Sequence, residues 1–348
     1  MADTPAHVTI EDVAQAAGVS VATVSRALRG LDNVAQSTRE KVELVAAELD
    51  YRANPAAAQL ATGSSRTILM AVSNIAGWYS AQVVGGAEAV LSEAGYETRV
   101  LGVAGPEALQ SFVRQAVHMH RNVDGLILVD LRLDPHEVEA LRATDIHVVT
   151  IGNAYPGLSS VRPDDISAAR LAVDHLLQLG HTRIALIEGM PDDPMRTEVS
   201  WRRRDGYEQT LAHQEIAVDP DLLQAGYFSI DGAQEAMQRL LSLDEPPTAV
   251  FAISDEMAMG AMGVIRDAGL SIPDDISVVG IDDHPLSKTV GLTTVKQEPA
   301  ASGAIAARWV VDDLASAECN LYTREVDIEL LVRRTTSSPA GRVVPGAG

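Results

Sequence analysis

Apolar residues recur at helical spacing in the first fifty residues, and this pattern predicts three short helices. The first begins after Thr9, whose hydroxyl and the Asp12 carboxylate three residues later fit a capping box, and it ends at Gly18. Ser20 is placed to cap the second helix, and the run Ser37–Glu40 fits another capping box for the third. The residues expected to face inward are Ile10, Val13, Ala14 and Ala17, then Val24, Ala27 and Leu28, then Val42, Val45, Ala46 and Leu49.

The second helix carries short and basic side chains on the side away from this core. Val21, Ala22, Ser25, Arg26 and Arg29 lie there. Two helices joined by a glycine-containing turn form a helix-turn-helix unit, whose second helix fits the major groove of DNA. An ordinary three-helix bundle with a mixed surface would show the same spacing, so the pattern alone leaves both interpretations open.

From about residue 67 onward, the pattern alternates between buried strands and helices. Short continuous apolar runs indicate parallel strands covered on both faces, at 67–72, 125–129, 147–151, 183–187, 249–253 and 276–281. Helical patterns lie between them, at 81–94, 166–179, 206–213 and 256–268. Gly95, Gly180 and Gly269 each follow a helix, where a left-handed residue is favoured. The alternation predicts a doubly wound α/β body with two lobes.

The segment between the head and the body is predicted to be a hinge. Pro55 follows Asn54, and the residue before a proline avoids the helical conformation, so the third helix stops there. Residues 56–61 could form a helix too short to be stable alone, although a plain linker would look the same. We expect a helix-turn-helix domain at 1–50, a hinge helix and linker at 51–66, a two-lobed domain at 67–336 and a disordered tail at 337–348.

Composition and charge restrict the function further. The chain has 348 residues and a net charge of −21, but residues 1–66 carry only −2 of it, so the acidic excess lies in the body. An acidic total argues against indiscriminate coating of nucleic acid. The single cysteine, Cys319, excludes a disulfide framework. Neither a signal-peptide pattern nor an apolar run long enough to span a bilayer is found, which predicts a cytoplasmic protein.

The body lacks the signatures of several enzyme classes built on α/β folds. There is no Gly-x-Gly-x-x-Gly after the first strand, no Walker loop and no Gly-x-Ser-x-Gly elbow. His118 and His120 alternate on a predicted helix, so their side chains diverge and no metal site is expected. No catalytic residue and no cofactor are predicted. Asp282 and Asp283 follow a strand, where carboxylates often act as ligands or bases, but an unpaired acidic turn fits equally well.

A long run in the head carries a more specific signal than spacing. The run is Thr9-Ile10-x-Asp12-Val13-Ala14-x-x-Ala17-Gly18-Val19-Ser20-x-x-Thr23-Val24-Ser25-Arg26-Ala27-Leu28, followed by Val34 and by Thr38-Arg39-Glu40-Lys41-Val42. It closely resembles the head of the lactose-repressor family of bacterial transcription regulators. The resemblance places DNA contacts at Thr9, Ser20, Val21, Ala22, Thr23, Ser25, Arg26, Arg29, Asn33 and Thr38. Val21 and Ala22 stand where the family varies most with operator sequence, and both can contact thymine methyl groups but form no bidentate hydrogen bonds.

The same resemblance implies a hinge helix that folds on the operator, with two copies in the minor groove. Leu60 would wedge between central base pairs and kink the DNA, and Ala57 would let the two helices approach closely. Asn54 is the remaining hinge contact that the resemblance implies. Family members usually have proline before this asparagine, where this chain has Ala53, with Pro55 after it instead.

The body resembles the same family in five runs, at 123–127, 176–185, 254–261, 269–283 and 292–297. The implied fold is that of periplasmic sugar-binding proteins, with two lobes, three crossovers and a ligand in the cleft. By resemblance, the residues that bind the effector are Trp78, Tyr79, Ser80, Arg203, Ser254 and Asp282.

These effector residues differ in how directly their chemistry fits a sugar. The planar fork of Arg203 can bind two hydroxyls or a carboxylate, although a surface arginine in the run 202–204 is the plainer interpretation. One carboxylate, Asp282, can accept from two adjacent hydroxyls. Ser254 replaces a common asparagine, which implies a shorter reach or a bridging water. Trp78 or Tyr79 could stack on a sugar ring, and core packing would explain them almost as well.

Together these observations predict a transcription regulator, a homodimeric repressor that binds a pseudopalindromic operator. A small-molecule effector, most simply a sugar, would bind between the lobes and change the order of the hinge. A nucleobase or nucleoside effector is the second choice. Two other classes stay open: a sugar- or nucleoside-binding receptor without DNA function, and an α/β enzyme acting on a sugar or nucleotide.

Overall fold

The computed structural model describes residues 8–28, 33–51, 64–119, 122–191, 198–316 and 320–339. The chain divides into two compact units, Met1–Ser65 and Arg66–Gly348. The division falls one residue before the end of the linker expected at 51–66. Most of that linker, including Asn54, Ala57 and Leu60, lies outside the described residues, as do Arg29, His120 and Cys319.

The head contains three helices around a small core: α1 (Ile10–Ala17), α2 (Val21–Leu28) and α3 (Gln36–Glu48). The Thr9 capping box is confirmed, since Thr9 Oγ1 accepts from the Asp12 backbone and Asp12 accepts from the Thr9 backbone at 2.8 Å. Gly18 ends α1 with a φ of 65°, as expected. The Ser37–Glu40 capping box is wrong, because α3 begins at Gln36 and the Gln36 amide occupies the Glu40 carboxylate at 3.0 Å.

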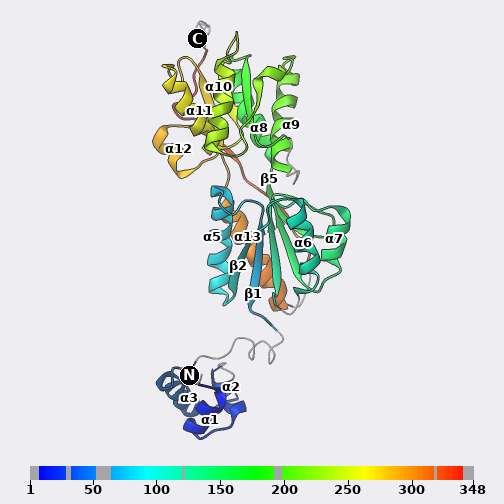
Figure 1. The fold of residues 1–348 in the computed structure, drawn as a ribbon, viewed down its shortest axis with the longest axis vertical. Helices are drawn as coiled ribbons and strands as arrows, with labels where there is room; N and C mark the ends of the chain where they lie inside the picture. Colours follow the sequence, from blue (N-terminus) through cyan, green and yellow to red (C-terminus); the bar gives the residue numbers. More distant parts are fainter. Residues whose placement is uncertain are drawn as a thin grey trace, which may run out of the picture. The chain divides into compact units, whose positions relative to one another are not determined.

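The first lobe of the body is a sheet with helices on both faces (Figure 1). Its strands lie in the order β11-β5-β4-β3-β1-β2, all parallel. Alternate residues of β1 divide the core: Ile68 and Met70 pack with α5 and α13, whereas Leu69 and Ala71 pack with α6 and α7. The elements are β1 (Thr67–Val72), α5 (Trp78–Glu93), β2 (Glu97–Gly102), α6 (Pro106–Ala116), β3 (Gly125–Val129), α7 (Pro135–Arg142), β4 (His147–Ile151), β5 (Ser159–Pro163), α13 (Pro299–Ser316) and β11 (Thr323–Val326).

The second lobe repeats this plan with the strand order β12-β10-β9-β8-β6-β7. Its strands are parallel except β12, which runs antiparallel to β10. Helix α8 packs against α9, and helix α10 packs against α11. All four helices lie over one continuous hydrophobic core. The elements are α8 (Asp165–Gln178), β6 (Ile184–Glu188), α9 (Glu198–His213), the short helix η2 (Pro220–Leu222), β7 (Leu223–Ala225), α10 (Ile230–Leu241), β8 (Ala249–Ala252), α11 (Asp255–Asp267), β9 (Ser277–Asp282), α12 (Pro285–Val290), β10 (Thr293–Lys296) and β12 (Glu329–Leu331).

The chain passes between the lobes three times, after β5, after β10 and after β11. The predicted doubly wound, two-lobed α/β body with three crossovers is therefore confirmed. Its return segment, α13, lies directly against α5 because both helices carry glycine at the contact: a Cβ on Gly303 would meet the Val83 carbonyl oxygen at 2.0 Å. Any side chain at Gly303 would force these two helices apart.

Two expectations for the body need correction. Helix α9 begins at Glu198, eight residues before the predicted start at Gly206, so Arg203 lies inside a helix. The tail expected to be disordered from residue 337 is held at its start, since the Ser337 backbone donates to Ser277 Oγ at 3.0 Å and Thr335 Oγ1 donates to the Val278 carbonyl at 2.7 Å. These bonds add the segment to the second lobe. Residues 340–348 lie outside the described part of the chain.

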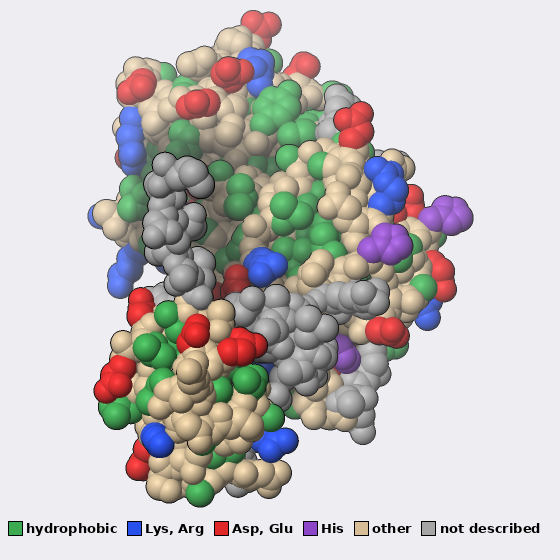
Figure 2. All heavy atoms as spheres, turned by 60° about the horizontal axis from the view of Figure 1, so that its bottom comes forward, with side chains coloured by type: hydrophobic (Ala, Val, Ile, Leu, Met, Phe, Trp, Pro, Cys, Tyr) green, Lys and Arg blue, Asp and Glu red, His purple; other side chains and the backbone are tan. Residues whose placement is uncertain are grey.

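The surface carries charges of both signs and exposed apolar side chains. Figure 2 shows hydrophobic side chains interspersed with acidic, basic and other polar ones on the face that it presents. Exposed apolar residues of the first lobe include Ile75, Val100 and Leu101, the last two on the edge strand β2. Among the described residues, no helix is long and apolar enough to cross a membrane.

Candidate functional sites

The first candidate site is the outer face of α2. Val24 and Ala27 are buried in the head core, while Val21 is 40 % exposed and Ala22 and Arg26 are also exposed. Ser20 caps the helix as predicted, since its Oγ accepts from the Thr23 backbone at 3.1 Å. Short side chains beside a free arginine give α2 the shape of a helix that can approach DNA closely.

The other predicted DNA contacts lie on the same small unit. Thr9, Ser20 and Asn33 are exposed, and Thr23, Ser25 and Thr38 are half-buried. Ser20 and Thr23 share a hydrogen bond between their hydroxyls at 2.8 Å, which fixes both at the start of α2. Hydroxyls at a helix N-terminus can bind a phosphate together with the free backbone N–H groups.

The second candidate site is a cavity of about 390 Å³ between the two lobes. Its walls come from the carboxyl ends of strands in both sheets, where ligands bind in open α/β folds. All of the predicted effector residues line this cavity: Trp78, Tyr79, Ser80, Arg203, Ser254 and Asp282. Residues on four separate elements, distant in sequence, thus converge on one site of the size expected for a small ligand.

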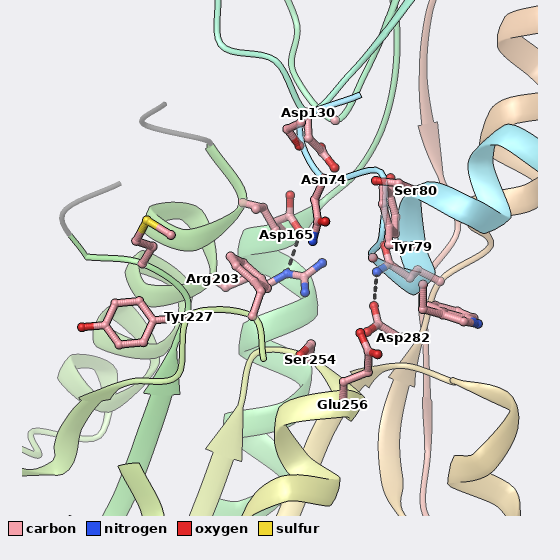
Figure 3. Close-up of a pocket in the computed structure, with 18 of the residues that line it drawn as sticks. Asn74, Tyr79, Ser80, Asp130, Asp165, Arg203, Tyr227, Ser254, Glu256 and Asp282 are labelled. Atoms are coloured by element: carbon pink, nitrogen blue, oxygen red, sulfur yellow. Dashed lines mark hydrogen bonds and ion pairs between the residues drawn. The ribbon is translucent and has the colours of Figure 1, made fainter. Parts of the chain in front are cut away.

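Arg203 lies at the centre of this cavity and is only 4 % exposed (Figure 3). Its Nε donates to Asp165 Oδ1 at 2.8 Å, and its Nη1 donates to the Ile253 carbonyl at 2.5 Å. Burial alone would lower the pKa of Arg203, but the carboxylates of Asp165 and Asp282 more than offset this and raise it. The interpretation of Arg203 as a surface arginine is therefore wrong, and the guanidinium keeps N–H groups for a ligand.

Asp282 ends β9 with its carboxylate in the cavity, and it is 6 % exposed. Its Oδ1 accepts from Gln297 Nε2 at 2.5 Å, and its Oδ2 accepts from the Asp255 backbone at 3.4 Å. The φ of Asp282 is 139°, a conformation that L residues avoid, so the fold holds this side chain in place at a cost. Burial, with the nearby Asp255 carboxylate, raises the pKa of Asp282. Asp282 is thus no unpaired acidic turn.

Asp255 supports this site from behind. It is fully buried and accepts from Ser287 Oγ and Thr294 Oγ1, each at 2.6 Å, and from the His284 backbone at 2.9 Å. These bonds fix the start of α11 and the loop after β9 relative to each other. Sequence reasoning missed this role because its partners are 29 to 39 residues away.

Aromatic side chains from both lobes complete the cavity. Trp78 and Tyr79 begin α5, and the Trp78 ring lies 5.0 Å from the ring of His284 in the second lobe. Tyr79 also packs against the first-lobe core, so it serves packing and lining at once. Tyr227 and Phe228 line the opposite side, both with positive φ. Apolar ring faces next to polar groups are typical of carbohydrate sites.

The two predicted serines lie at the starts of helices. Ser254 caps α11, and its Oγ accepts from the Met257 backbone at 3.3 Å. Its hydroxyl can still donate to a ligand, but its position is set by the helix. Ser80 is 4 % exposed within the first turn of α5. Both residues line the cavity, as the resemblance predicts.

Asp130 is the important residue that sequence reasoning missed. It follows β3, lines the cavity, and lies against the bare Cα of Gly152: a Cβ there would be 2.0 Å from Asp130 Oδ1. Burial, together with the Asp165 carboxylate, raises the pKa of Asp130 to about 7 although Arg203 opposes the shift. The signal was available, because Asp130 directly follows a predicted strand, as Asp282 does.

Comparisons with known proteins agree with this architecture. Residues 9–54 match the family described as "Bacterial regulatory proteins, lacI family", and residues 173–336 match a "Periplasmic binding protein-like domain". The HTH-type transcriptional repressor CytR of Escherichia coli (strain K12) is 33 % identical over 94 % of this chain and 96 % of its own.

Two solved structures are similar over nearly their whole length. The lac repressor dimer bound to operator and the anti-inducer ONPF has a TM-score of 0.83 and 31 % identity, covering 95 % of this chain and 99 % of that one. The complex of the transcriptional regulator CelR with cellobiose has a TM-score of 0.68 and 30 % identity, covering 94 % of this chain and 99 % of that one.

A helix-turn-helix head followed by a two-lobed ligand-binding body defines a class of regulated DNA-binding proteins. This chain belongs to the LacI family of bacterial transcription regulators. It is therefore a DNA-binding regulator and not an enzyme.

Proposed function

We propose that this protein is a repressor that binds a pseudopalindromic operator as a homodimer and responds to a sugar held between its lobes. In a bacterial cell it would act in the cytoplasm, where the operator is. The observation that carries the proposal is the convergence of Arg203, Asp282 and the aromatic residues on one cavity formed by both lobes. A ligand there contacts both lobes at once, so it favours one relative orientation of the lobes over another.

The choice of a sugar is supported by chemistry and by one similar structure. Paired carboxylate and guanidinium groups bind hydroxyls, and ring faces such as those of Trp78 and Phe228 stack on the C–H face of a pyranose. The similar regulator CelR was solved with cellobiose.

Dimerisation is supported by the exposed edge of the first lobe. Strand β2 lies at the end of its sheet, and Val100 and Leu101 there are 38 % and 41 % exposed. An unpaired edge strand with apolar side chains is a surface that a second copy can cover.

Replacing Leu101 by aspartate is expected to weaken the dimer at least about tenfold, because it places a charge in the apolar edge surface. Sedimentation velocity across a concentration series measures this. Leu286→Asp is the matched control, since Leu286 is 53 % exposed in the second lobe. Equal dimerisation by wild type and Leu101→Asp would reject this interface.

Selection from a pool of randomised DNA duplexes tests the proposed operator binding. Wild type is expected to enrich a two-fold symmetric sequence. Arg26→Ala should lower the affinity for that sequence by about 1–3 kcal/mol and relax the preference at one base pair in each half-site. Lys41→Ala, an exposed cation of the same unit, should leave the base preference unchanged.

Failure to enrich any sequence would contradict the proposal and favour a receptor without DNA function. Unchanged preference in Arg26→Ala would remove this arginine from base recognition. Fluorescence anisotropy on the selected duplex measures both outcomes.

A further inference from the structure

The charges around the cavity between the lobes are unbalanced. Among the described residues that line it, the carboxylates are Asp130, Asp165, Glu256 and Asp282, and the only cation is Arg203. Because Arg203 is already paired with Asp165 at 2.8 Å, its charge is largely neutralised before any ligand arrives. The ligand therefore meets a cavity lined by more acidic than basic side chains among the described residues.

Asp130 and Glu256 are the lining carboxylates whose side chains have no hydrogen bond among the described residues, whereas Asp282 accepts from Gln297 and Asp165 from Arg203. Figure 3 shows Asp130 entering from the first lobe above Asn74 and Asp165. The charged groups that act on it are Asp165 and Arg203, and the phenol of Tyr79 interacts with Asp130 electrostatically. The Asp130 side chain is half-buried at the wall of the cavity, and a ligand hydroxyl or ammonium that displaces water from it would supply a hydrogen-bond donor.

We infer that the cavity selects a polyhydroxylated ligand without negative charge, and that Asp130 accepts a hydrogen bond from it. This inference rests on the proposed effector function and narrows it. Phosphorylated sugars, sugar acids and nucleotides are excluded, because their anionic groups would face three further carboxylates with no free cation among the described lining residues. An amino group in place of a hydroxyl is accepted. Neutral sugars and nucleosides share the required chemistry, vicinal hydroxyls on an uncharged ring.

The test compares matched pairs of ligands on the wild-type protein by isothermal titration calorimetry. The neutral members are glucose, ribose, cellobiose and the common nucleosides. Their anionic partners are glucose 6-phosphate, ribose 5-phosphate, glucuronate and the nucleoside 5′-monophosphates, and glucosamine is the cationic member. We expect binding by at least one neutral or cationic member, with its anionic partner at least about 100-fold weaker. The sugar and nucleoside series show which source supplies the effector.

A variant shows whether Asp130 causes the selection. Asp130→Asn should weaken the neutral ligand about tenfold and reduce the discrimination against its anionic partner by a similar factor. The control is Asp267→Asn, which removes an exposed carboxylate at the end of α11, outside the cavity lining. It should change neither affinity.

Equal or tighter binding of an anionic partner would overturn the inference, as would the failure of every neutral and cationic member to bind at millimolar concentration. Operator binding is measured on the same preparations. If the operator is bound and an anionic compound alters that binding, the charge selection is wrong and the proposed function stands. If no operator is selected, the proposed function fails whichever ligands bind.

Discussion

Replacing Arg203 by alanine is expected to abolish the effect of any effector on operator binding and to destabilise the body by about 3–5 kcal/mol. The second effect follows from the burial of the pair, since the side chains of Arg203 and Asp165 are 5 % and 4 % exposed. Truncating the arginine leaves Asp165 enclosed without its cation. It also removes the donor that reaches the Ile253 carbonyl.

The neighbouring arginine provides a matched control. Arg204 pairs with Glu208 and Glu188, but its side chain is 38 % exposed, so water can enter the space that it leaves and solvate the exposed Glu208. Arg204→Ala should cost no more than about 1 kcal/mol and leave the effector response intact. Urea unfolding of the full chain, with operator binding measured with and without effector, separates the two variants.

Two outcomes would contradict this interpretation. If Arg203→Ala were as stable as wild type, the Arg203–Asp165 pair would contribute nothing to the interlobe structure. If it stayed responsive, the effector would bind elsewhere. The double variant Arg203→Met with Asp165→Leu replaces both charged groups by apolar ones. If this variant recovers the stability of wild type but does not respond to effector, the unpaired charge of Asp165 causes the destabilisation of Arg203→Ala.

Local patterns predicted those parts of the fold that depend on neighbouring residues. The capping box of Thr9 and Asp12 needs only four consecutive residues, and it is present. The equivalent pattern at Ser37 and Glu40 fails because α3 already begins at Gln36 with Ala35 as its N-cap, so Ser37 lies inside the first turn. A helix boundary is the least certain feature of any such pattern.

Burial explains which strands could be found. Strands β1, β3 and β4 are buried on both faces and read as continuous apolar runs. Strand β2 was missed, because five of its six residues are exposed and its sequence is mixed. An edge strand of this kind forms through its hydrogen bonds to β1, which no local pattern reveals.

The residues of the cavity also divide into those that the sequence predicts and those that it does not. Its predicted residues all line it, since the family resemblance carried their positions from a fold that the chain shares. Asp165 and Asp255 were missed, because their importance comes from partners 27 or more residues away in sequence, such as Arg203 for Asp165. Asp130 was missed although it directly follows a predicted strand.

Replacing Asp130 by asparagine is expected to stabilise the ligand-free body, by an amount that grows with pH. Burial raises the pKa of Asp130 to about 7 in the folded chain, above the ordinary pKa of 3.8 for this group. The stability that the folded state gains by keeping this group protonated is fully present below the unfolded pKa. This stability decreases as the pH rises from the unfolded pKa to the folded pKa, because over that range the unfolded chain releases the proton while the folded chain keeps it. The loss is complete above the folded pKa. Asparagine has the same shape and does not ionise, so its folded state avoids this loss.

The expected gain of Asp130→Asn over wild type increases by about 2–3 kcal/mol between roughly pH 5 and pH 8. Urea unfolding of the body at several pH values measures it, with Asp267→Asn as the control that should show no such trend. A difference that stays constant with pH would mean that Asp130 is already ionised and solvated. A growing difference would show that the fold keeps a destabilising carboxylate in its cavity, which is expected where a ligand supplies the missing donor.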